Sequence, residues 1–208
     1  MTKVKICGIT NLEDALHAVE SGADMLGFNF CEKSPRYVEP RFARDIVRSL
    51  PDEVIKVGIF VNMEDYRIGE FVDLIGLTAV QLHGDEDRAF VKELKRNTDA
   101  ILIKAIRVDQ DFRTTSVSEY GVDAVLLDSY SVDKYGGTGN QFDWATARAA
   151  RDLVPALYLA GGLTPENVAE AVRIVRPSAV DAASGVESSP GKKDPKKVEA
   201  FIRNAKNV

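Results

Sequence analysis

Short apolar runs alternate with amphipathic segments along the whole chain. The apolar runs cover residues 4–7, 25–30, 54–61, 79–82, 101–106, 124–127, 156–160 and 178–182. Between them, apolar residues recur at spacings of three and four, which is the period of a helix with one buried face. The pattern therefore predicts eight strands that alternate with helices. Sharing 208 residues among eight units gives 208/8 = 26 per unit, enough for one strand, one helix and two short loops.

Alternating strands and helices predict parallel strands joined by right-handed crossovers. With eight units, the expected fold is α/β, a single-domain (β/α)8 TIM barrel that occupies residues 1–208. An open doubly wound sheet is the alternative. That sheet would carry a glycine-rich dinucleotide fingerprint after its first strand, whereas residues 7–11 read C-G-I-T-N. The barrel is therefore the preferred fold.

Alternation within each predicted strand divides its residues between two faces. If the more apolar face lies under the helices, the mixed face points to the barrel axis. This assignment predicts a ring of inward lysines, Lys5, Lys56 and Lys104, with Asp128 and Asp181 as the nearest partners. The alternative is that one or more of these lysines extends outward between helices.

Composition restricts the partners and the compartment. The chain has 27 Lys and Arg against 32 Asp and Glu, a formal net charge of −5, so no broad basic surface is expected. Without such a surface we do not expect nucleic acid as a partner. We do not expect a membrane either, because the longest apolar stretch, residues 153–163, is too short to span a bilayer. Cys7 and Cys31 cannot form a disulfide framework, and the first residues lack a secretory signal. We expect a cytoplasmic protein with reduced thiols.

Two residues at predicted strand ends could form an acid/base pair. Cys7 ends the first strand on the inward face, and Lys5 is a cation that could lower the pKa of its thiol. Asp128 ends the sixth strand after an apolar run, where desolvation would raise its pKa as a general acid requires. The alternatives are a small buried thiol and a loop-capping carboxylate. His83 is a base or a polar wall residue, and with two histidines and no clustered ligands we expect no metal site.

A phosphate site is predicted from two loops after strands seven and eight. Gly161 and Gly162 precede a predicted helix, and Ser184-x-x-Glu187 resembles a capping box that opens a short extra helix beside Gly185. These two loops form the usual phosphate cradle of the barrel. The alternative is that the glycines only serve tight turns.

Nine motifs follow one another in order: K-I-C-G-I-T (5–10), G-A-D-M-L-G-F-N-F (22–30), S-P-R-Y-V (34–38), V-G-I-F-V-N (57–62), V-Q-L-H-G-D-E (80–86), L-L-D-S (126–129), G-G-T-G-x-x-F-D-W (136–144), A-G-G-L-T-P-E-N-V (160–168) and S-G-V-E-x-x-P-G-K-K-D (184–194). Together they make the chain resemble phosphoribosylanthranilate isomerase of tryptophan biosynthesis. The resemblance implies a monomeric or homodimeric barrel that binds a small phosphorylated substrate. It also implies a cofactor-free Amadori rearrangement of N-(5-phosphoribosyl)anthranilate to 1-(2-carboxyphenylamino)-1-deoxyribulose 5-phosphate.

The resemblance also assigns roles to single residues. It implies that Asp128 is the general acid, Cys7 the general base, and Arg36 the ligand of the anthranilate carboxylate. The remaining substrate-binding residues are His83, Gly161, Gly162, Asp181, Ser184 and Gly185. One position departs from the family pattern, because Ala183 stands where a serine hydroxyl is usual. Two other functions stay open: a histidine-pathway sugar-phosphate isomerase on a related barrel, and a barrel that binds a phosphorylated ligand without converting it.

Overall fold

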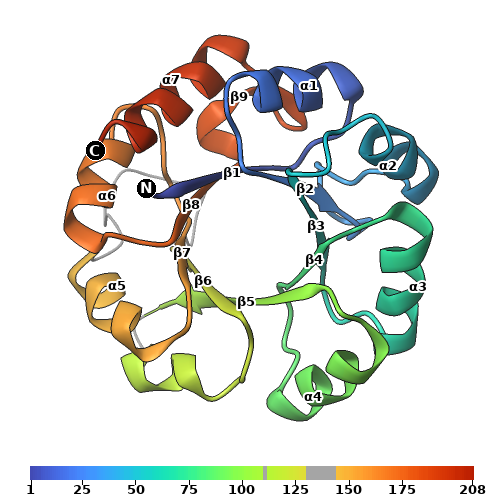
Figure 1. Cartoon of the computed structure of the whole chain (residues 1–208). Helices are drawn as coiled ribbons and strands as arrows, with labels where there is room; N and C mark the ends of the chain where they lie inside the picture. Colours follow the sequence, from blue (N-terminus) through green and yellow to red (C-terminus); the bar gives the residue numbers. More distant parts are fainter. Residues whose placement is uncertain (110–111, 130–143) are drawn as a thin grey trace.

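Eight parallel strands close into a barrel in the order of the sequence (Figure 1). The computed structural model describes residues 1–109, 112–129 and 144–208. The strands are β1 (Lys3–Cys7), β2 (Met25–Asn29), β3 (Ile55–Phe60), β4 (Ala79–Leu82), β5 (Ile101–Val108), β6 (Ala124–Ser129), β7 (Leu157–Leu159) and β8 (Ala179–Ala182). All eight coincide with the predicted apolar runs to within two residues. The predicted (β/α)8 barrel is therefore confirmed as a single-domain fold.

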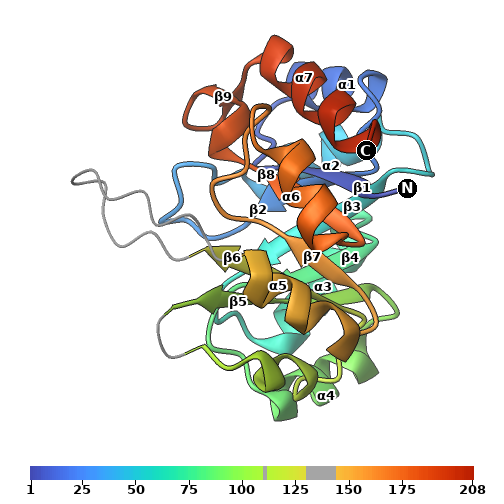
Figure 2. The same ribbon diagram turned by 90° about the vertical axis from the view of Figure 1, so that its left-hand side faces the viewer.

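Helices surround the barrel and cover the outer face of the strands (Figures 1 and 2). They are α1 (Leu12–Glu20), α2 (Pro40–Val47), α3 (Asp65–Ile75), α4 (Arg88–Asn97), α5 (Trp144–Ala150), α6 (Val168–Val175) and α7 (Pro195–Lys206), with 3-10 turns η1 (Thr114–Ser118), η2 (Arg151–Leu153) and η3 (Ser184–Val186). Local chemistry starts several of them. Asn11 caps α1 by accepting from the Asp14 amide, and Pro40 and Pro195 occupy the first turns of α2 and α7.

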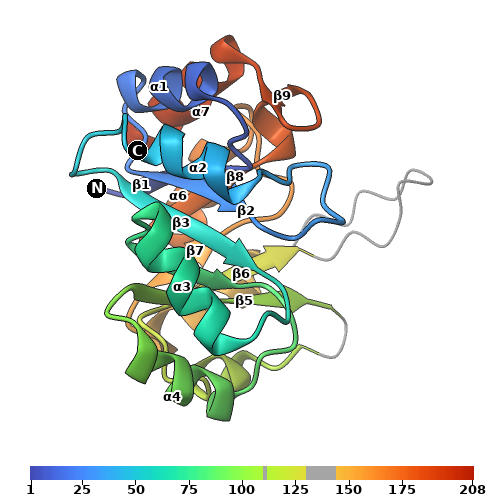
Figure 3. The same cartoon turned by 90° about the vertical axis from the view of Figure 1, so that its right-hand side faces the viewer.

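A two-stranded hairpin follows β8 and was not predicted. It pairs β9 (Glu187–Ser189) with β10 (Lys192–Lys193) in antiparallel fashion. In Figures 2 and 3 this hairpin lies near the end of the barrel toward which the β6 arrow points. It therefore lies at the mouth formed by the carboxyl ends of the strands. Strands this short carry no periodicity that a sequence could display.

Two apolar clusters separate the inside of the barrel from its outside. The smaller one consists mainly of strand residues, among them Val57, Ile103 and Leu126, and fills the barrel interior. The larger one joins the other strand faces, such as Phe60 and Leu102, to the helices. Alternation along each strand accounts for this division, since neighbouring residues point to opposite faces.

The predicted ring of inward lysines is wrong. Lys5 alone of the three points into the barrel, where it meets Asp181. Lys56 donates to the Pro51 carbonyl at 2.6 Å, and Lys104 donates to Glu86 at 2.8 Å on the outer face. The prediction failed because β3 and β5 carry apolar residues on both faces, so the rule that the more apolar face lies outward could not orient them.

Within the ranges that the structure describes, no helix is both long and apolar enough to cross a bilayer. The G-G-T-G run at 136–139 lies outside those ranges.

Candidate active site

Four of the predicted site residues come from the carboxyl ends of four strands. Cys7 ends β1, His83 follows β4, Asp128 lies near the end of β6, and Asp181 lies in β8. Each is in phase with the residues that face the interior of its strand. The structure therefore brings the predicted acid and base to one mouth. Catalytic groups of this fold are placed at that end of the barrel.

The Cys7 thiol has close packing on one side and charged groups below. A Cβ at Gly27 on the neighbouring strand would lie 2.9 Å from Cys7 Sγ, so only glycine leaves room for the thiol there. Below it, Lys5 Nζ donates to Asp181 Oδ2 at 2.9 Å, and the Lys5 side chain is fully buried. The other carboxylate oxygen, Asp181 Oδ1, is buried and has no partner among the described residues. Asp181 thus has one carboxylate oxygen bound to Lys5 and one that accepts from no described group.

The electrostatics of Cys7 correct one expectation. Burial raises the pKa of the thiol above its usual value, and the charge of Asp181 adds to the rise. Lys5 acts in the predicted, lowering direction and Lys193 adds to it, but together they do not outweigh burial. Burial therefore favours the neutral form of the Cys7 thiol.

Asp128 and His83 form a contact across neighbouring sides of the mouth. His83 Nε2 lies 3.5 Å from Asp128 Oδ2, and Gln81 Nε2 lies 3.1 Å from His83 Nδ1. When Gln81 donates to Nδ1, the ring proton is on Nε2 and points toward Asp128. The Asp128 side chain is 31% exposed, so the expected burial against an apolar wall is not found. Gln81 was missed by the sequence analysis, although it is in phase with His83 on the same strand.

Arg36 is held by a partner that the sequence analysis interpreted differently. Its Nε and Nη2 donate to the two oxygens of Glu187 at 2.8 and 2.7 Å. The predicted capping box at Ser184 is wrong, because η3 has no side-chain cap and Glu187 instead accepts from Arg36 and from Lys193. Lys193 also donates to the carbonyl of Ala183, a contact that does not depend on the side chain at that position.

The two glycine loops lie against each other as expected for a common anion site. A Cβ at Gly185 would fall 1.9 Å from the Leu163 carbonyl oxygen, so the loop after β8 packs on the loop after β7. Gly161 and Gly162 both have positive φ, 83° and 66°, which favours glycine. Among the described residues, the amides of these two glycines and of Ser184 and Gly185 have no acceptor. Contrary to prediction, α6 begins only at Val168, beyond the glycine pair.

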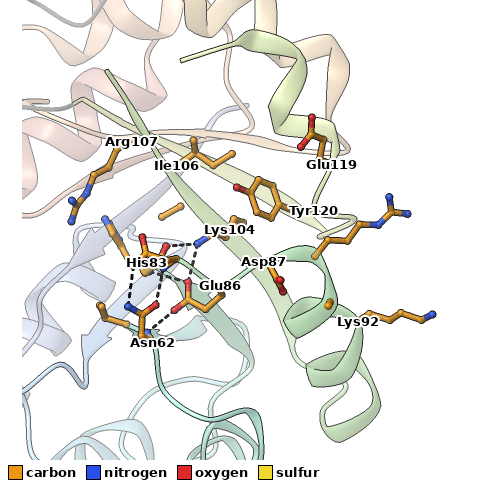
Figure 4. Close-up of a pocket in the computed structure, with 16 residues that line it drawn as sticks. Asn62, His83, Glu86, Asp87, Lys92, Lys104, Ile106, Arg107, Glu119 and Tyr120 are labelled. Atoms are coloured by element: carbon orange, nitrogen blue, oxygen red, sulfur yellow. Dashed lines mark hydrogen bonds and ion pairs between the residues drawn. The ribbon is translucent and has the colours of Figure 1, made fainter. Parts of the chain in front are cut away.

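A cavity of about 1070 Å³ opens beside the mouth, between the ends of β4 and β5 (Figure 4). His83 and Arg107 lie at one end and Lys92 at the other. Arg107 pairs in register with Asp128, and it is exposed. The sequence analysis did not single it out. Within the described part of the chain, no group of three or more His, Cys, Asp or Glu side chains is placed to hold a metal ion.

The comparisons with known proteins agree over the whole chain. A model of the N-(5'-phosphoribosyl)anthranilate (PRA) isomerase family matches residues 4–204. An N-(5'-phosphoribosyl)anthranilate isomerase of Citrifermentans bemidjiense is 52% identical over 208 residues, which is all of this chain and 98% of that protein.

Two solved structures are similar over their full lengths. One contains monomers generated from the dimeric phosphoribosylanthranilate isomerase of Thermotoga maritima, with a TM-score of 0.89 and 44% identity. The other is a phosphoribosyl anthranilate isomerase in complex with reduced 1-(o-carboxyphenylamino)-1-deoxyribulose 5-phosphate, with a TM-score of 0.88 and 44% identity. Both comparisons cover 100% of this chain and of the other.

Proposed function

This chain belongs to the N-(5'-phosphoribosyl)anthranilate isomerase family, and from that premise we propose how residues at its barrel mouth carry out the reaction. The reaction is the isomerisation of N-(5-phosphoribosyl)anthranilate to 1-(2-carboxyphenylamino)-1-deoxyribulose 5-phosphate in tryptophan biosynthesis. The observation that carries the assignment of roles is the placement of a thiol and a carboxyl group, Cys7 and Asp128, on inward-facing positions of one mouth. The named relatives favour this substrate over that of the histidine-pathway isomerase, and an acid/base pair is not needed by a protein that only binds.

Asp128 is the general acid in the first step. It gives a proton to the furanose ring oxygen while the bond between that oxygen and sugar C1 breaks. The aniline nitrogen supplies the electron pair, so ring opening leaves a protonated Schiff base. His83, 3.5 Å from Asp128, is placed to return a proton to the carboxylate or to orient it.

Cys7 is the general base in the second step. Its thiolate removes the proton from C2, the electrons of that bond move toward the iminium nitrogen, and an enolamine forms. Tautomerisation to the ketone then places a proton on C1 and removes one from the C2 hydroxyl. C2 is oxidised and C1 reduced within one molecule, which is an intramolecular aldose-ketose type of change, so we propose that no cofactor takes part. Burial raises the pKa of Cys7, and the positive charge of the Schiff base adds to that of Lys5 in stabilising the thiolate.

The remaining residues bind the two anionic ends of the substrate. The free amides of Gly161, Gly162, Ser184 and Gly185 hold the phosphate, supported by the close packing of the two loops that carry them. Arg36 binds the anthranilate carboxylate. Asp181 has a buried acceptor, Oδ1, that suits a sugar hydroxyl.

The unit of function is one catalytic domain over residues 1–208, working in the cytoplasm as a monomer or homodimer. The family match over residues 4–204 supports the single domain. The Thermotoga maritima relative is a dimeric isomerase from which monomers were generated, and this supports both the monomer and the homodimer as possible states of the proposal.

Replacement of Cys7 by Ser tests the assignment of the base. We expect kcat to fall about 10³-fold with little change in KM, because the hydroxyl is a far weaker base at neutral pH. Cys31→Ser is the matched control, since Cys31 lies in the loop after β2, and it should leave kcat within about twofold. Turnover by Cys7→Ser close to that of the native chain would refute the role of the thiol.

Growth tests the substrate. The native chain should allow a tryptophan auxotroph that lacks this isomerase to grow on medium without tryptophan, and Asp128→Asn should not. Failure of the well-expressed native chain to rescue growth would argue against the proposed reaction.

A further inference from the structure

Three charged side chains form a cluster next to the segment that carries Cys7. Glu187 accepts from Arg36 Nε and Nη2 at 2.8 and 2.7 Å, and from Lys193 Nζ at 2.9 Å. The contacts connect the loop after β2 to the hairpin of β9 and β10, segments that are 151 residues apart in the chain. The hairpin is thereby linked to the mouth of the barrel.

Two of the three charged side chains in this cluster are buried, so their charges have to be paired. The side chains of Glu187 and Lys193 are 4% and 1% exposed, whereas that of Arg36 is 23% exposed. Burial opposes ionisation of Glu187, but hydrogen bonds from Arg36 and Lys193 outweigh it and lower the pKa of the carboxyl group. Glu187 is therefore an anion at neutral pH. It holds two cations that would otherwise repel each other.

The cluster also contacts the backbone beside the thiol. Lys193 Nζ donates to the carbonyl oxygen of Cys7. The aliphatic part of the Arg36 side chain lies over Gly8, where an added Cβ would come within 2.6 Å of Arg36 Cδ. Gly8 has a φ of 77°, so the chain turns there in a conformation that favours glycine. Arg36 thus lies directly against the residue that follows the proposed base.

The bidentate contact leaves a defined part of Arg36 free. A guanidinium group has five N–H donors arranged along two usable edges. Glu187 takes the edge made by Nε and Nη2, and within the described parts of the chain the guanidinium has no other acceptor. The edge made by Nη1 and Nη2 is left for a second carboxylate, and the partial exposure of Arg36 gives it access.

We propose that Glu187 is a positioning residue for substrate recognition: it fixes Arg36 so that the free edge of the guanidinium receives the anthranilate carboxylate, while Lys193 balances its charge. The inference rests on the proposed function, which gives Arg36 that ligand. Glu187 does not touch the substrate in this scheme. Its effect passes through Arg36, which separates it from a residue that only stabilises the fold.

A double-mutant cycle between Glu187→Gln and Arg36→Met tests the inference. Glu187→Gln alone should raise KM about 10- to 100-fold and leave kcat within about threefold, since a charge-assisted contact that orients Arg36 is lost. In the Arg36→Met background, Glu187→Gln should change KM by no more than about twofold, because there is no guanidinium left to orient.

Each other outcome of the cycle overturns the inference in a recognisable way. An equal rise of KM in both backgrounds would show a purely structural role. A fall of KM in Glu187→Gln would show that Glu187 competes with the substrate for Arg36. If Arg36→Met by itself left KM unchanged, the proposed function of Arg36 would fail first, and this inference with it.

A charge-balanced variant guards against loss of folding. Glu187→Gln leaves the buried Lys193 without its anion, which is a costly change. Glu187→Gln combined with Lys193→Met removes both charges of the buried pair and leaves Arg36 in place. It should fold with a higher melting temperature than Glu187→Gln and still show the raised KM. A native KM in this folded variant would contradict the positioning role.

Discussion

Two buried lysines of the barrel wall make nearly the same contact and serve different ends. Lys5 lies 2.9 Å from Asp181 inside the barrel, and Lys104 lies 2.8 Å from Glu86 on the outer face. Both side chains are 3% exposed or less. Lys5 precedes Cys7 by two residues on the same strand and lowers the pKa of that thiol. Lys104 instead also donates to the Gly84 carbonyl and holds the loop after β4 in place. The face of the strand, and not the strength of the pair, decides whether such a pair acts on chemistry or on the fold.

The largest effect on activity is expected when Lys5 is replaced. We expect Lys5→Met to lower kcat about 100-fold, because the cation that favours the Cys7 thiolate is gone while the charge of Asp181 remains. The remaining activity should appear at higher pH than in the native chain, which a pH profile of kcat would record. Lys5→Met combined with Asp181→Asn should regain stability without regaining kcat. A native kcat and pH profile in Lys5→Met would contradict the difference between the two pairs.

Lys104 should affect stability alone. Lys104→Met leaves Glu86 buried without its cation, and we expect the free energy of unfolding to fall by about 3–5 kcal/mol. Urea denaturation measures this loss. At a temperature where the variant is folded, kcat should stay within about threefold of the native value. A loss of kcat as large as that of Lys5→Met would show that the outer pair also acts on the site.

The smallest expected effect concerns the stability of the protein at alkaline pH. The folded state raises the pKa of Cys7, so the folded chain keeps its thiol proton at a pH where the unfolded chain, with a cysteine pKa of about 8.5, has lost it. The contribution of Cys7 to stability is thus complete below that pH and is lost as pH rises through the folded pKa. Melting temperatures between pH 7 and 10 should fall more steeply for the native chain than for Cys7→Ser, and parallel curves would contradict the raised pKa.

Strand positions were predictable to within two residues, but strand orientation was not always so. In β1 and β4 polar residues mark the inner face, and in β6 a single polar residue near the carboxyl end marks it, so Lys5, His83 and Asp128 were placed correctly on the inner face. In β3 and β5 both faces carry apolar residues, and the lysines at 56 and 104 were placed on the wrong side. Long side chains with a charged end can reach a partner from either face. Only the closed barrel shows which face its strands turn inward.

The residues of the candidate site also divide into those that the sequence predicted and those that only the structure revealed. Residues at strand ends and glycines in loops were found, because topology alone brings strand ends together. Glu187 was interpreted as a helix cap, since its local spacing fits a capping box, but the structure places it against Arg36 and Lys193. Local spacing cannot reveal a partner 151 residues away.

The sequence by itself determined the number of barrel strands, their order and the residues at their carboxyl ends, because hydrophobic periodicity is a local property that each segment expresses independently. The tertiary structure decided the rest: the inward face of β3 and β5, the clustering of Arg36, Glu187 and Lys193, and the burial that raises the pKa of the Cys7 thiol. Those features depend on which groups meet after the barrel closes and on how far they are desolvated there. No single segment of the chain determines either.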